Sequence, residues 1–534
     1  MHLADLPYAS TRMPVFGANG VVATSQPLAA QAGLEVLRAG GNAVDAAIAT
    51  AVALTVVEPT SNGIGGDLFA LVWDGSSLHG LNSSGRAPSG LSADRLRESG
   101  NDRMPELGWA PVTVPGAPAG WAMLHEKFGR LDFERLFDAA TGYADNGYPV
   151  PVVVGRSWKA AEARFGSLSG AEFVGWRETF MPGGNVPAIG SRWASPDHAK
   201  TLRRIASTGA RDFYEGELAA QIAAFSERTG GYLTGDDLAK HVSNWVDPIG
   251  IDYRGHTVWE IPPNGQGIAA LIALGMLEGF DVAAHPHGSE QIWHWQIEAM
   301  KLAFADAHKY VADPDFADDV SDALLSRAHL DARRALIGER AEARAPAALP
   351  TGGTIYLCTA DRDGLMVSLI QSNYHGFGSG VVVPGTGIAL HNRGNGFSLE
   401  PGHRNVLEPR KRPFHTIIPA FITKGDKPIG PFGVMGAPMQ PQGHMQVVSS
   451  MVDHGLNPQA ALDAPRWRFL EGNRTVVESA TAQSVYRALI ARGHELVEPA
   501  AAYQVGRGQI IWQLDDGVYV AGTEPRADGC AAVF

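Results

Sequence analysis

The sequence predicts a layered α+β fold in which strands are buried between other layers of structure. Its 534 residues are 45% hydrophobic and 19% charged, which is an ordinary globular composition with enough apolar material for a large core. Helical periodicity dominates residues 120–345, whereas β-rich runs follow residue 353. Two of these runs, residues 354–360 and 365–372, are apolar on both faces, so we expect them in the middle of a layered sandwich.

Residues 21–57 are expected to form a strand, a helix, a turn and a second helix. Pro27 suits the first turn of the first helix, and the two glycines at 40–41 end it. Asn42 can cap the second helix, whose many alanines allow it to pack very close to a neighbour. A glycine-rich turn then precedes an apolar strand at residues 68–73.

The stretch 339–353 is small, charged and proline-bearing, which predicts a mobile surface linker. The two β-rich runs after it are joined by residues 361–364, whose Asp-Arg-Asp-Gly sequence is a clear hairpin signal. Further elements are expected beyond this hairpin: strands at residues 381–383, 417–422 and 432–435, and a helix at residues 441–455.

The formal net charge of −13 argues against nucleic acid or an anionic membrane surface as a partner, because both repel an acidic chain. The most apolar early stretch, residues 43–57, is too short for a membrane span and carries Asp45. The first residues contain no basic segment followed by an apolar one, so we expect a cytoplasmic protein. Cys358 and Cys530 cannot build a disulfide framework, although one bridge between them stays open.

Thr354 is the first candidate for chemistry, because it opens a β-rich run directly after the linker. A strand-initial threonine is commonly no more than a β-branched strand former. The chemistry of a nucleophile is nevertheless coherent at this position. The Thr354 hydroxyl could attack the carbonyl before it, and Gly353 lets the backbone twist to that geometry. Hydrolysis would then free a threonine whose own α-amine acts as general base for its hydroxyl.

Gly436 and Ala437 are the second candidate, because they follow an apolar strand and precede the helix expected at residue 441. Backbone N–H groups at such a turn can form an oxyanion hole, although a plain tight turn is the local alternative. The run 376–380 is not G-x-S-x-G, so a serine-hydrolase elbow is not supported. The 18 histidines show no metal-ligand spacing and no Walker A motif occurs, so we expect no metal and no other cofactor.

Ordered motifs extend over nearly the whole chain. In the first half they are Gly40-Gly-Asn-Ala-Val-Asp-Ala-Ala47, Gly63-Ile-Gly-Gly66, Val114-Pro-Gly116, Trp121, Pro262-Pro-Asn-Gly265 and Asp313-Pro314. In the second half they are Gly353-Thr354 through Asp361, Phe377-Gly-Ser-Gly380, Gly387-Ile388, Lys411-Arg-Pro413 and Pro525-Arg526. In this order they resemble the γ-glutamyltransferase family of N-terminal nucleophile (Ntn) hydrolases.

The resemblance implies a four-layer αββα sandwich, the Ntn-hydrolase fold, and a precursor that cuts itself between Gly353 and Thr354. The cut would give a large subunit of residues 1–353 and a small subunit of residues 354–534, which stay together as one domain. A dimer of such pairs stays open. In the family pattern Thr354 is the nucleophile and Ser372 carries the hydroxyl that supports it.

The resemblance also gives a role to the turn at Gly436 and Ala437. This turn falls where the family has a Gly-Gly pair that supplies the N–H groups of the oxyanion hole. Ala437 departs from that pair, but it keeps its N–H group and tolerates the backbone angle the site demands. The departure at Ala437 therefore does not exclude activity.

The substrate pocket departs further from the family pattern. Members that hold a γ-glutamyl group use an arginine for its α-carboxylate and an aspartate for its α-amine, and these positions fall on Ser84 and Gly396. A pair of serines near the carboxylate becomes His415 and Thr416. Because desolvated charge pairs contribute strongly to recognition, losing both should weaken glutamyl binding. Arg86 could replace the lost positive charge.

The variant segments 371–374, 392–394 and 414–416 resemble a separate cytoplasmic branch of the family. That branch includes YwrD-like proteins and oxamate amidohydrolases, and cephalosporin-acylase-like proteins share its scaffold. A substrate with an anionic acyl group would suit Arg86, Arg393 or His415. His375, like its neighbour at 374, either shapes the pocket wall or packs as an ordinary side chain. The expected substrate-binding residues are Arg86, Tyr374, Asn392, Arg393, His415 and Thr416.

Three functions follow from the sequence. The first is an amidohydrolase that cleaves a small acidic amide such as oxamate through a Thr354 acyl-enzyme. The second is a γ-glutamyl hydrolase or transpeptidase that acts on glutathione-like substrates with a rearranged pocket. The third is a catalytically inactive family member, against which Thr354 and Ser372 argue, because an inactive copy need not keep either hydroxyl.

Overall fold

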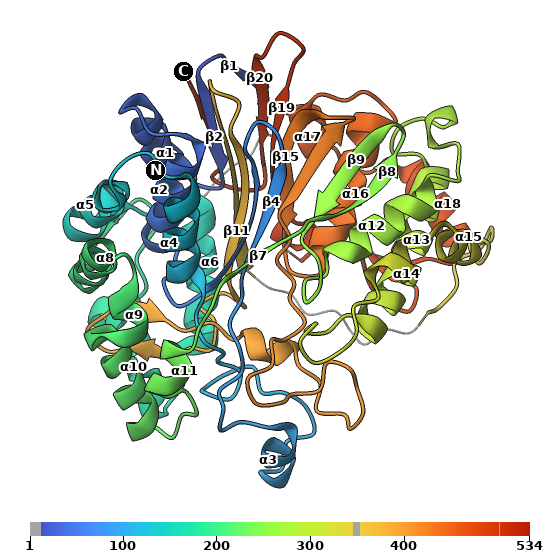
Figure 1. The fold of residues 1–534 in the computed structure, drawn as a ribbon. Helices are drawn as coiled ribbons and strands as arrows, with labels where there is room; N and C mark the ends of the chain where they lie inside the picture. The colour runs from blue at the N-terminus through green and yellow to red at the C-terminus, as the bar shows by residue number, and fades with distance from the viewer. Residues whose placement is uncertain (1–11, 345–352, 501) are drawn as a thin grey trace.

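The computed structural model describes residues 12–344, 353–500 and 502–534, which form four layers (Figure 1). Two seven-stranded antiparallel sheets pack face to face in the centre, and helices cover the outer face of each. The apolar cluster between the sheets includes Phe69, Tyr356, Ile370, Phe421 and Ile511. This arrangement confirms the αββα sandwich.

The first sheet contains the segment that begins at the expected cleavage site. Its strand order is β21 (Cys530–Val533), β2 (Gly20–Thr24), β10 (Gly353–Asp361), β11 (Met366–Tyr374), β3 (Asp67–Trp73), β4 (Leu78–Ser83) and β7 (Asn244–Val246). β10 and β11 form the expected hairpin. Every residue of β11 is buried, as is every residue of β10 after Gly353, because helices cover one face of the sheet and the second sheet covers the other.

The second sheet supplies the turn that was expected to form the oxyanion hole. Its strand order is β1 (Val15–Gly17), β20 (Tyr519–Thr523), β19 (Arg507–Gln513), β15 (Lys427–Met435), β14 (Ala420–Lys424), β9 (His256–Glu260) and β8 (Ile249–Tyr253). Gly436 follows β15 directly, and it lines the same pocket as the first residues of β10. Two strands from different sheets therefore bring Thr354 and Gly436 to one pocket.

Two N-terminal helices cover the first sheet, on the left of Figure 1. α1 (Pro27–Arg38) begins at Pro27, and the side chain of Gln26 accepts hydrogen bonds from its first N–H groups. α2 (Ala43–Val57) is capped by Asn42, whose side chain and the side chain of Asp45 form a capping box. Every residue of α2 is buried, because its alanines let neighbouring helices and the sheet approach closely.

The helices α12 (Gly267–Leu277), α13 (Glu290–Tyr310) and α16 (Met439–Val452) cover the second sheet, on the right of Figure 1. Their apolar side chains form one cluster with the outer face of that sheet. α13 lies within residues 120–345, where helical periodicity was expected to dominate. The helix expected at residues 441–455 is α16, which begins at Met439.

Some elements differ from the prediction. β7, β8 and β9 lie within the region expected to be mostly helical, and they are strands because they pair with β4 and β14. β14 begins at Ala420 rather than at residue 417, because Pro419 has no N–H group for the strand ladder. The strand expected at residues 381–383 is a two-residue strand, β12 (Val382–Val383).

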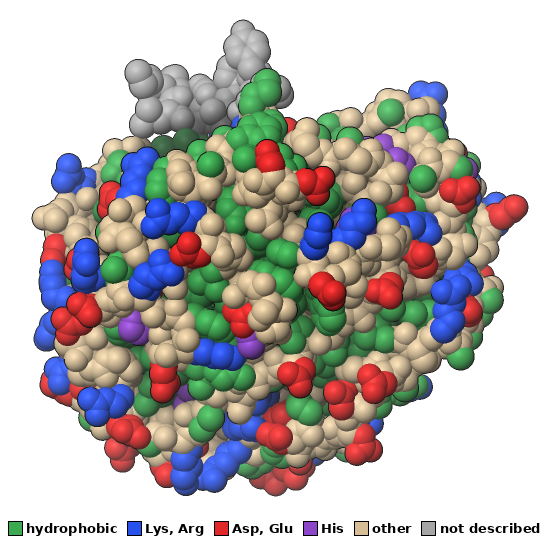
Figure 2. Space-filling view, turned by 45° about the horizontal axis from the view of Figure 1, so that its top comes forward, with side chains coloured by type: hydrophobic (Ala, Val, Ile, Leu, Met, Phe, Trp, Pro, Cys, Tyr) green, Lys and Arg blue, Asp and Glu red, His purple; other side chains and the backbone are tan. Residues whose placement is uncertain are grey.

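Other expectations concern the linker, the cysteines and the surface. Residues 345–352 of the expected linker lie outside the described residues. Cys358 and Cys530 are both free thiols. Within the described part of the chain, no helix is both long and apolar enough to cross a membrane. Figure 2 shows acidic and basic side chains interspersed over the viewed face.

Candidate active site

Thr354 lies at the start of β10 on the wall of a pocket of about 590 Å³. Its side chain is only 1% exposed. Gly353 also lines this pocket, and a Cβ there would lie 3.3 Å from the backbone atoms Gly376 N, Ser61 Cα and Thr60 O. The residue before Thr354 is therefore crowded on several sides, which explains why glycine stands at this position.

Ser372, on the neighbouring strand β11, connects the Thr354 hydroxyl to the Gly353 carbonyl. Ser372 Oγ donates a hydrogen bond to the Gly353 oxygen at 2.9 Å and accepts one from the Tyr374 N–H at 2.8 Å. Thr354 Oγ1 lies 3.1 Å from Ser372 Oγ. Because the Ser372 proton is already used on Gly353, the Thr354 hydroxyl is the donor in this pair. The β10–β11 ladder shifts register between Gly353 and Ile355, which frees the backbone for this contact.

Gly436 and Ala437 form the turn between β15 and α16, and Gly436 lines the Thr354 pocket. Their φ angles are 136° and 54°, so Ala437 occupies the left-handed region that glycine prefers. Gln266 Nε2 holds this conformation by donating to the Ala437 oxygen at 2.9 Å and to the Thr416 oxygen at 2.6 Å. Among the described residues, no acceptor pairs with the N–H group of Gly436 or Ala437. Both N–H groups are available to an oxyanion.

Asp67 gathers two of the predicted substrate-binding residues, His415 and Arg393, in a buried polar cluster. His415 Nε2 donates to Asp67 Oδ2 at 2.9 Å, His391 Nδ1 lies 3.2 Å from the same oxygen, and Arg393 Nε lies 3.8 Å away. Burial alone would raise the pKa of Asp67, but His391 and His415 outweigh it and hold that pKa below its usual range. Burial, together with Arg393, lowers the pKa of His415 to about 3, so its ring is neutral.

Arg393 lies behind the pocket rather than on its wall. Its Nη1 donates to Thr416 Oγ1 at 2.7 Å, and its guanidinium covers the Tyr374 ring at 4.3 Å. Burial lowers the pKa of Arg393 to about 10, and its Nη2 has no partner among the described residues. The Tyr374 ring also stacks on the His375 ring, with their centroids 3.9 Å apart. Tyr374, with a φ of 73°, therefore separates Arg393 from the pocket.

His375 is the pocket residue whose tautomer the structure fixes. Asn392 Nδ2 donates a hydrogen bond to the ring atom His375 Nδ1 at 3.2 Å. Asn392 Oδ1 accepts a hydrogen bond from the backbone N–H of His375 at 3.1 Å. The ring proton therefore lies on Nε2, which has no partner among the described residues. Burial lowers the pKa of His375 to about 3, with Arg164 and Arg393 adding to the effect. His375 offers the pocket a neutral N–H donor.

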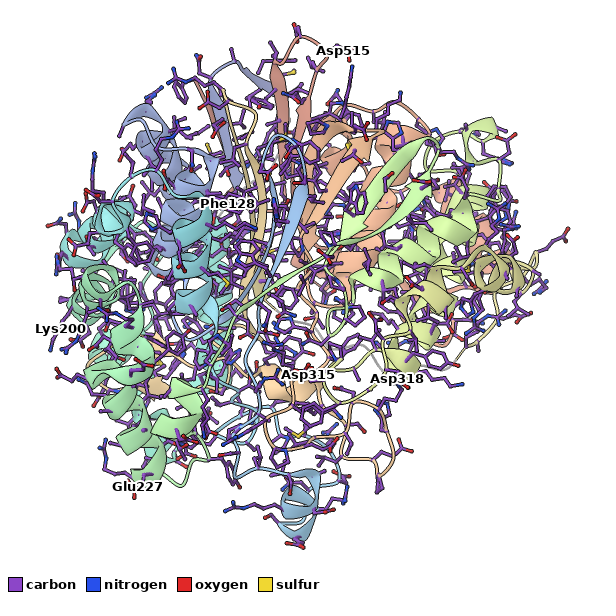
Figure 3. The ribbon with its side chains drawn as sticks, in the orientation of Figure 1. Phe128, Lys200, Glu227, Asp315, Asp318 and Asp515 are labelled. Carbon is purple, nitrogen blue, oxygen red and sulfur yellow. The ribbon has the colours of Figure 1, made fainter. Side chains whose placement is uncertain are left out.

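None of the six predicted substrate-binding residues lines the Thr354 pocket itself, and Arg86 is also paired elsewhere. Its guanidinium pairs with Asp313 at 3.0 Å and with Asp315 at 2.5 Å, and it lines a different pocket together with Asp237. Asp315, labelled in Figure 3, lies below the lower ends of the central sheets. The two carboxylates satisfy Arg86, so it does not supply the positive charge of the Thr354 pocket.

The positive charge of that pocket comes instead from residues that sequence reasoning missed. The lining contains four arginines and no acidic side chain; the arginines are Arg156, Arg164, Arg507 and Arg526. The first two lie eight residues apart on one face of α6 (Val152–Phe165). Arg526 belongs to a quoted sequence motif and could have been found from it, whereas no sequence signal distinguishes Arg507.

One group of described residues has the composition of a metal site. His294, Glu298 and His494 offer ligand atoms within 4.8 Å of one another. Lys301 Nζ already contacts Glu298 Oε1 at 2.6 Å, and His294 bonds to His494 at 2.9 Å. The chain's own ammonium group thus neutralises the carboxylate, and we assign no metal to this cluster.

Comparison with known proteins gives a consistent set of relatives. Residues 29–534 match the sequence profile of a family described as Gamma-glutamyltranspeptidase. The chain is 36% identical over 533 residues to the glutathione hydrolase-like YwrD proenzyme of Bacillus subtilis, covering 97% of this chain and 99% of that protein. It is 33% identical over 532 residues to the oxamate amidohydrolase proenzyme of Klebsiella pneumoniae, covering 97% and 98%. The crystal structure of cephalosporin acylase from Bacillus halodurans matches with a TM-score of 0.95 at 53% identity, covering 99% of this chain and 98% of that one.

Proposed function

Because the chain belongs to the gamma-glutamyltranspeptidase family, we propose that it is a self-cleaving N-terminal-threonine amidohydrolase that hydrolyses a small acidic amide such as oxamate. The observation that carries this proposal is the position of Ser372 Oγ. This atom contacts both the nucleophilic hydroxyl of Thr354 and the carbonyl of Gly353 that the hydroxyl would attack. A hydroxyl that contacts both reacting groups is suited to assist acyl transfer between them.

Self-cleavage would proceed by attack of Thr354 Oγ1 on the Gly353 carbonyl carbon. The bond from that carbon to the Thr354 nitrogen breaks, the nitrogen takes the hydroxyl proton, and an ester joins Gly353 to Oγ1. The Ser372 hydroxyl stabilises the charge that develops on the Gly353 oxygen. Water then hydrolyses the ester, which leaves a carboxylate on Gly353 and a free α-amine on Thr354.

The fold supports the proposed division into subunits of residues 1–353 and 354–534. β10 and β11 of the small subunit lie between β2 and β3 of the large subunit in one sheet. β21 of the small subunit pairs with β2 on its other side. Strands of the two subunits therefore alternate, and the ladder hydrogen bonds would hold them together after the cut.

In the mature enzyme the freed α-amine of Thr354 would act as general base for its own hydroxyl. The hydroxyl attacks the substrate's amide carbon, and the N–H groups of Gly436 and Ala437 stabilise the oxyanion. The amine leaves with a proton, and water hydrolyses the ester to release the acid. Each group in this sequence lies on the chain, and no step requires a cofactor.

The charge of the pocket supports an acidic substrate. Four arginines line it and no carboxylate does, so an anion would be attracted to the site. A γ-glutamyl substrate also carries an α-amine, and Gly396 stands where an aspartate would be needed to bind it. The γ-glutamyl alternative therefore has less support. The free state of Cys358 and Cys530 fits the cytoplasmic location that we also propose.

The proposal is tested first on a denaturing gel of purified protein. We expect two fragments that correspond to residues 1–353 and 354–534, whereas one intact band after long incubation would refute self-cleavage. Release of ammonia from oxamate is then measured beside release of para-nitroaniline from γ-glutamyl-para-nitroanilide. Faster turnover of the γ-glutamyl anilide would favour the alternative function over an amidohydrolase for small acidic amides.

A further inference from the structure

We propose that Arg507 forms an anion subsite beside Thr354 and binds a carboxylate of the substrate. The inference rests on the proposed function and identifies the residue that selects an acidic amide. Arg507 is the first residue of β19 and lies opposite Met435, the last residue of β15 before the oxyanion turn. The preceding Gly506 has its Cα 3.3 Å from the position of a Cβ on Gly436. Arg507 therefore starts next to the expected oxyanion hole.

The guanidinium of Arg507 is a buried cation with unused hydrogen-bonding capacity. The residue is 9% exposed and lines the Thr354 pocket. Its nearest charged partner is Glu58, whose Oε1 lies 3.6 Å from Nη1 and is therefore beyond hydrogen-bond reach. In the described part of the chain, the five N–H donors of this side chain make no hydrogen bond, since the 3.6 Å contact with Glu58 is too long for one, and Glu58 Oε1 is itself unpartnered. A carboxylate from the pocket could accept two of these donors at once.

Arg526 lines the same pocket, but its hydrogen-bond donors are already used. Its Nε and one Nη2 hydrogen are donated to Glu478, and its Nη1 hydrogens go to Glu524 and the Leu462 oxygen. Its remaining Nη2 hydrogen goes to the Ala464 oxygen. All five donors are thus used inside the protein, so Arg526 contributes charge to the pocket but has no free donor for a ligand.

The remaining cations are also less suited to this role. Arg164 is 37% exposed and pairs with Glu106 at 2.8 Å, which places it at the rim in contact with water. Arg393 is fully buried and separated from the pocket by the Tyr374 ring. Arg156, on α6, is exposed to water, so a hydrogen bond from it to a ligand would be weaker. Arg507 combines burial, pocket access and unused donors, which is the combination that makes a charged hydrogen bond strong.

Glu58 is the positioning residue for this subsite. It is 1% exposed, and its Oε2 accepts a hydrogen bond from Ser25 at 2.5 Å. This bond orients the buried carboxylate, which is not among the residues that line the pocket, and its attraction to Arg507 Nη1 at 3.6 Å positions the guanidinium without occupying its donors. A bound carboxylate would then complete a chain in which Arg507 lies between two anions.

The test compares two pairs of amides that differ by one carboxylate. Oxamate and its neutral amide, oxamide, differ in charge on the acyl side. Acetyl-para-nitroanilide and its ring-carboxylated derivative differ in charge on the leaving-group side. For whichever pair the wild-type enzyme discriminates, we expect Arg507→Met to lower kcat/KM for the charged member by roughly 10- to 100-fold and to leave the neutral member unchanged.

Matched variants separate recognition from folding. Arg507→Lys should retain part of the preference, because an ammonium keeps the charge but loses the bidentate fork. Arg474→Met makes the same substitution at a surface arginine that pairs with Glu471, and it should change nothing. Two fragments on a denaturing gel and an unchanged Tm establish that each variant has folded and matured.

The outcomes are distinct. A lower kcat/KM of Arg507→Met for the charged member alone, in either pair, supports the subsite. It also identifies the end of the substrate that carries the carboxylate. An equal decrease in kcat/KM for the charged and neutral members, or no decrease for either, overturns the proposed subsite. A wild-type enzyme that hydrolyses amides without preferring the charged member also overturns the subsite but leaves the proposed function intact. A wild-type enzyme that hydrolyses none of these amides refutes the proposed function itself.

Discussion

Replacement of Ser372 by alanine is the sharpest test of the reaction centre. The Ser372 hydroxyl makes three contacts: with Thr354 at 3.1 Å, with the Gly353 oxygen at 2.9 Å and with the Tyr374 N–H at 2.8 Å. The change would leave the buried Tyr374 N–H without an acceptor, which costs about 1–3 kcal/mol of stability. It would also remove the donor aimed at the developing oxyanion, and loss of one such donor slows acyl transfer by about 10²- to 10³-fold.

The assay follows the disappearance of the intact precursor on a denaturing gel after rapid purification. Wild-type protein and Ser372→Ala are compared, together with a Ser368→Ala control. Ser368 is also buried on β11 and contacts a hydroxyl, that of Tyr356 at 2.8 Å, but it does not touch Thr354. The control should lose stability and mature at the normal rate. If Ser372→Ala matures as fast as the control, the role assigned to Ser372 is wrong.

Three further predictions concern Thr354, Ala437 and Asp67. Thr354→Ala should remain one intact chain without amidase activity, and a split at that bond on a gel would implicate another nucleophile. Ala437→Gly should retain activity and change the free energy of unfolding by at most about 1 kcal/mol in denaturant titrations, because relief of left-handed strain is offset by added chain entropy. The pKa of Asp67 is depressed below 3.8 in the folded state, so the ionised carboxylate stabilises the fold above that pH and loses this effect as the pH falls below it. Asp67→Asn should therefore flatten the dependence of Tm on pH below about pH 3.8.

Local signals predicted the elements whose ends are fixed by neighbouring residues. Asn42 caps α2, and Pro27 begins α1, as the sequence indicated. The turn at residues 361–364 joins β10 to β11. These features depend on contacts within a few residues, so periodicity and capping chemistry are enough to find them. Thr354 at a strand start was visible for the same reason.

The pairing of charges could not be predicted in the same way. Arg86 was expected at the substrate, but its partner Asp313 lies 227 residues away in the chain. Asp313 was itself part of a quoted motif, yet nothing local connected the two. Arg507 and Gln266 likewise act on residues far from them in sequence. Such contacts depend on the sheet order, which the local pattern does not determine.

The net charge of the chain gave no guide to the charge of its pocket. A chain of net charge −13 is expected to repel anions overall. The pocket nevertheless contains four arginines and no carboxylate among its lining residues, so its local potential has the opposite sign. A focused positive site in an acidic protein attracts a small anionic substrate, while the surrounding surface disfavours large polyanions. The proposed preference for small acidic amides would therefore be a property of the site alone.

The sheet also explains how the chain can be cut at the reaction centre and keep its structure. The ladder between β10 and β2 begins at Leu357, three residues beyond Thr354. In the ladder between β10 and β11, Gly353 pairs with Tyr374, and this pair lies on the N-terminal side of the scissile bond. Cleavage would therefore release this pair and leave the rest of both ladders intact. The same cut would free the Thr354 amine at the pocket wall, so maturation would need only a local rearrangement to create the proposed general base.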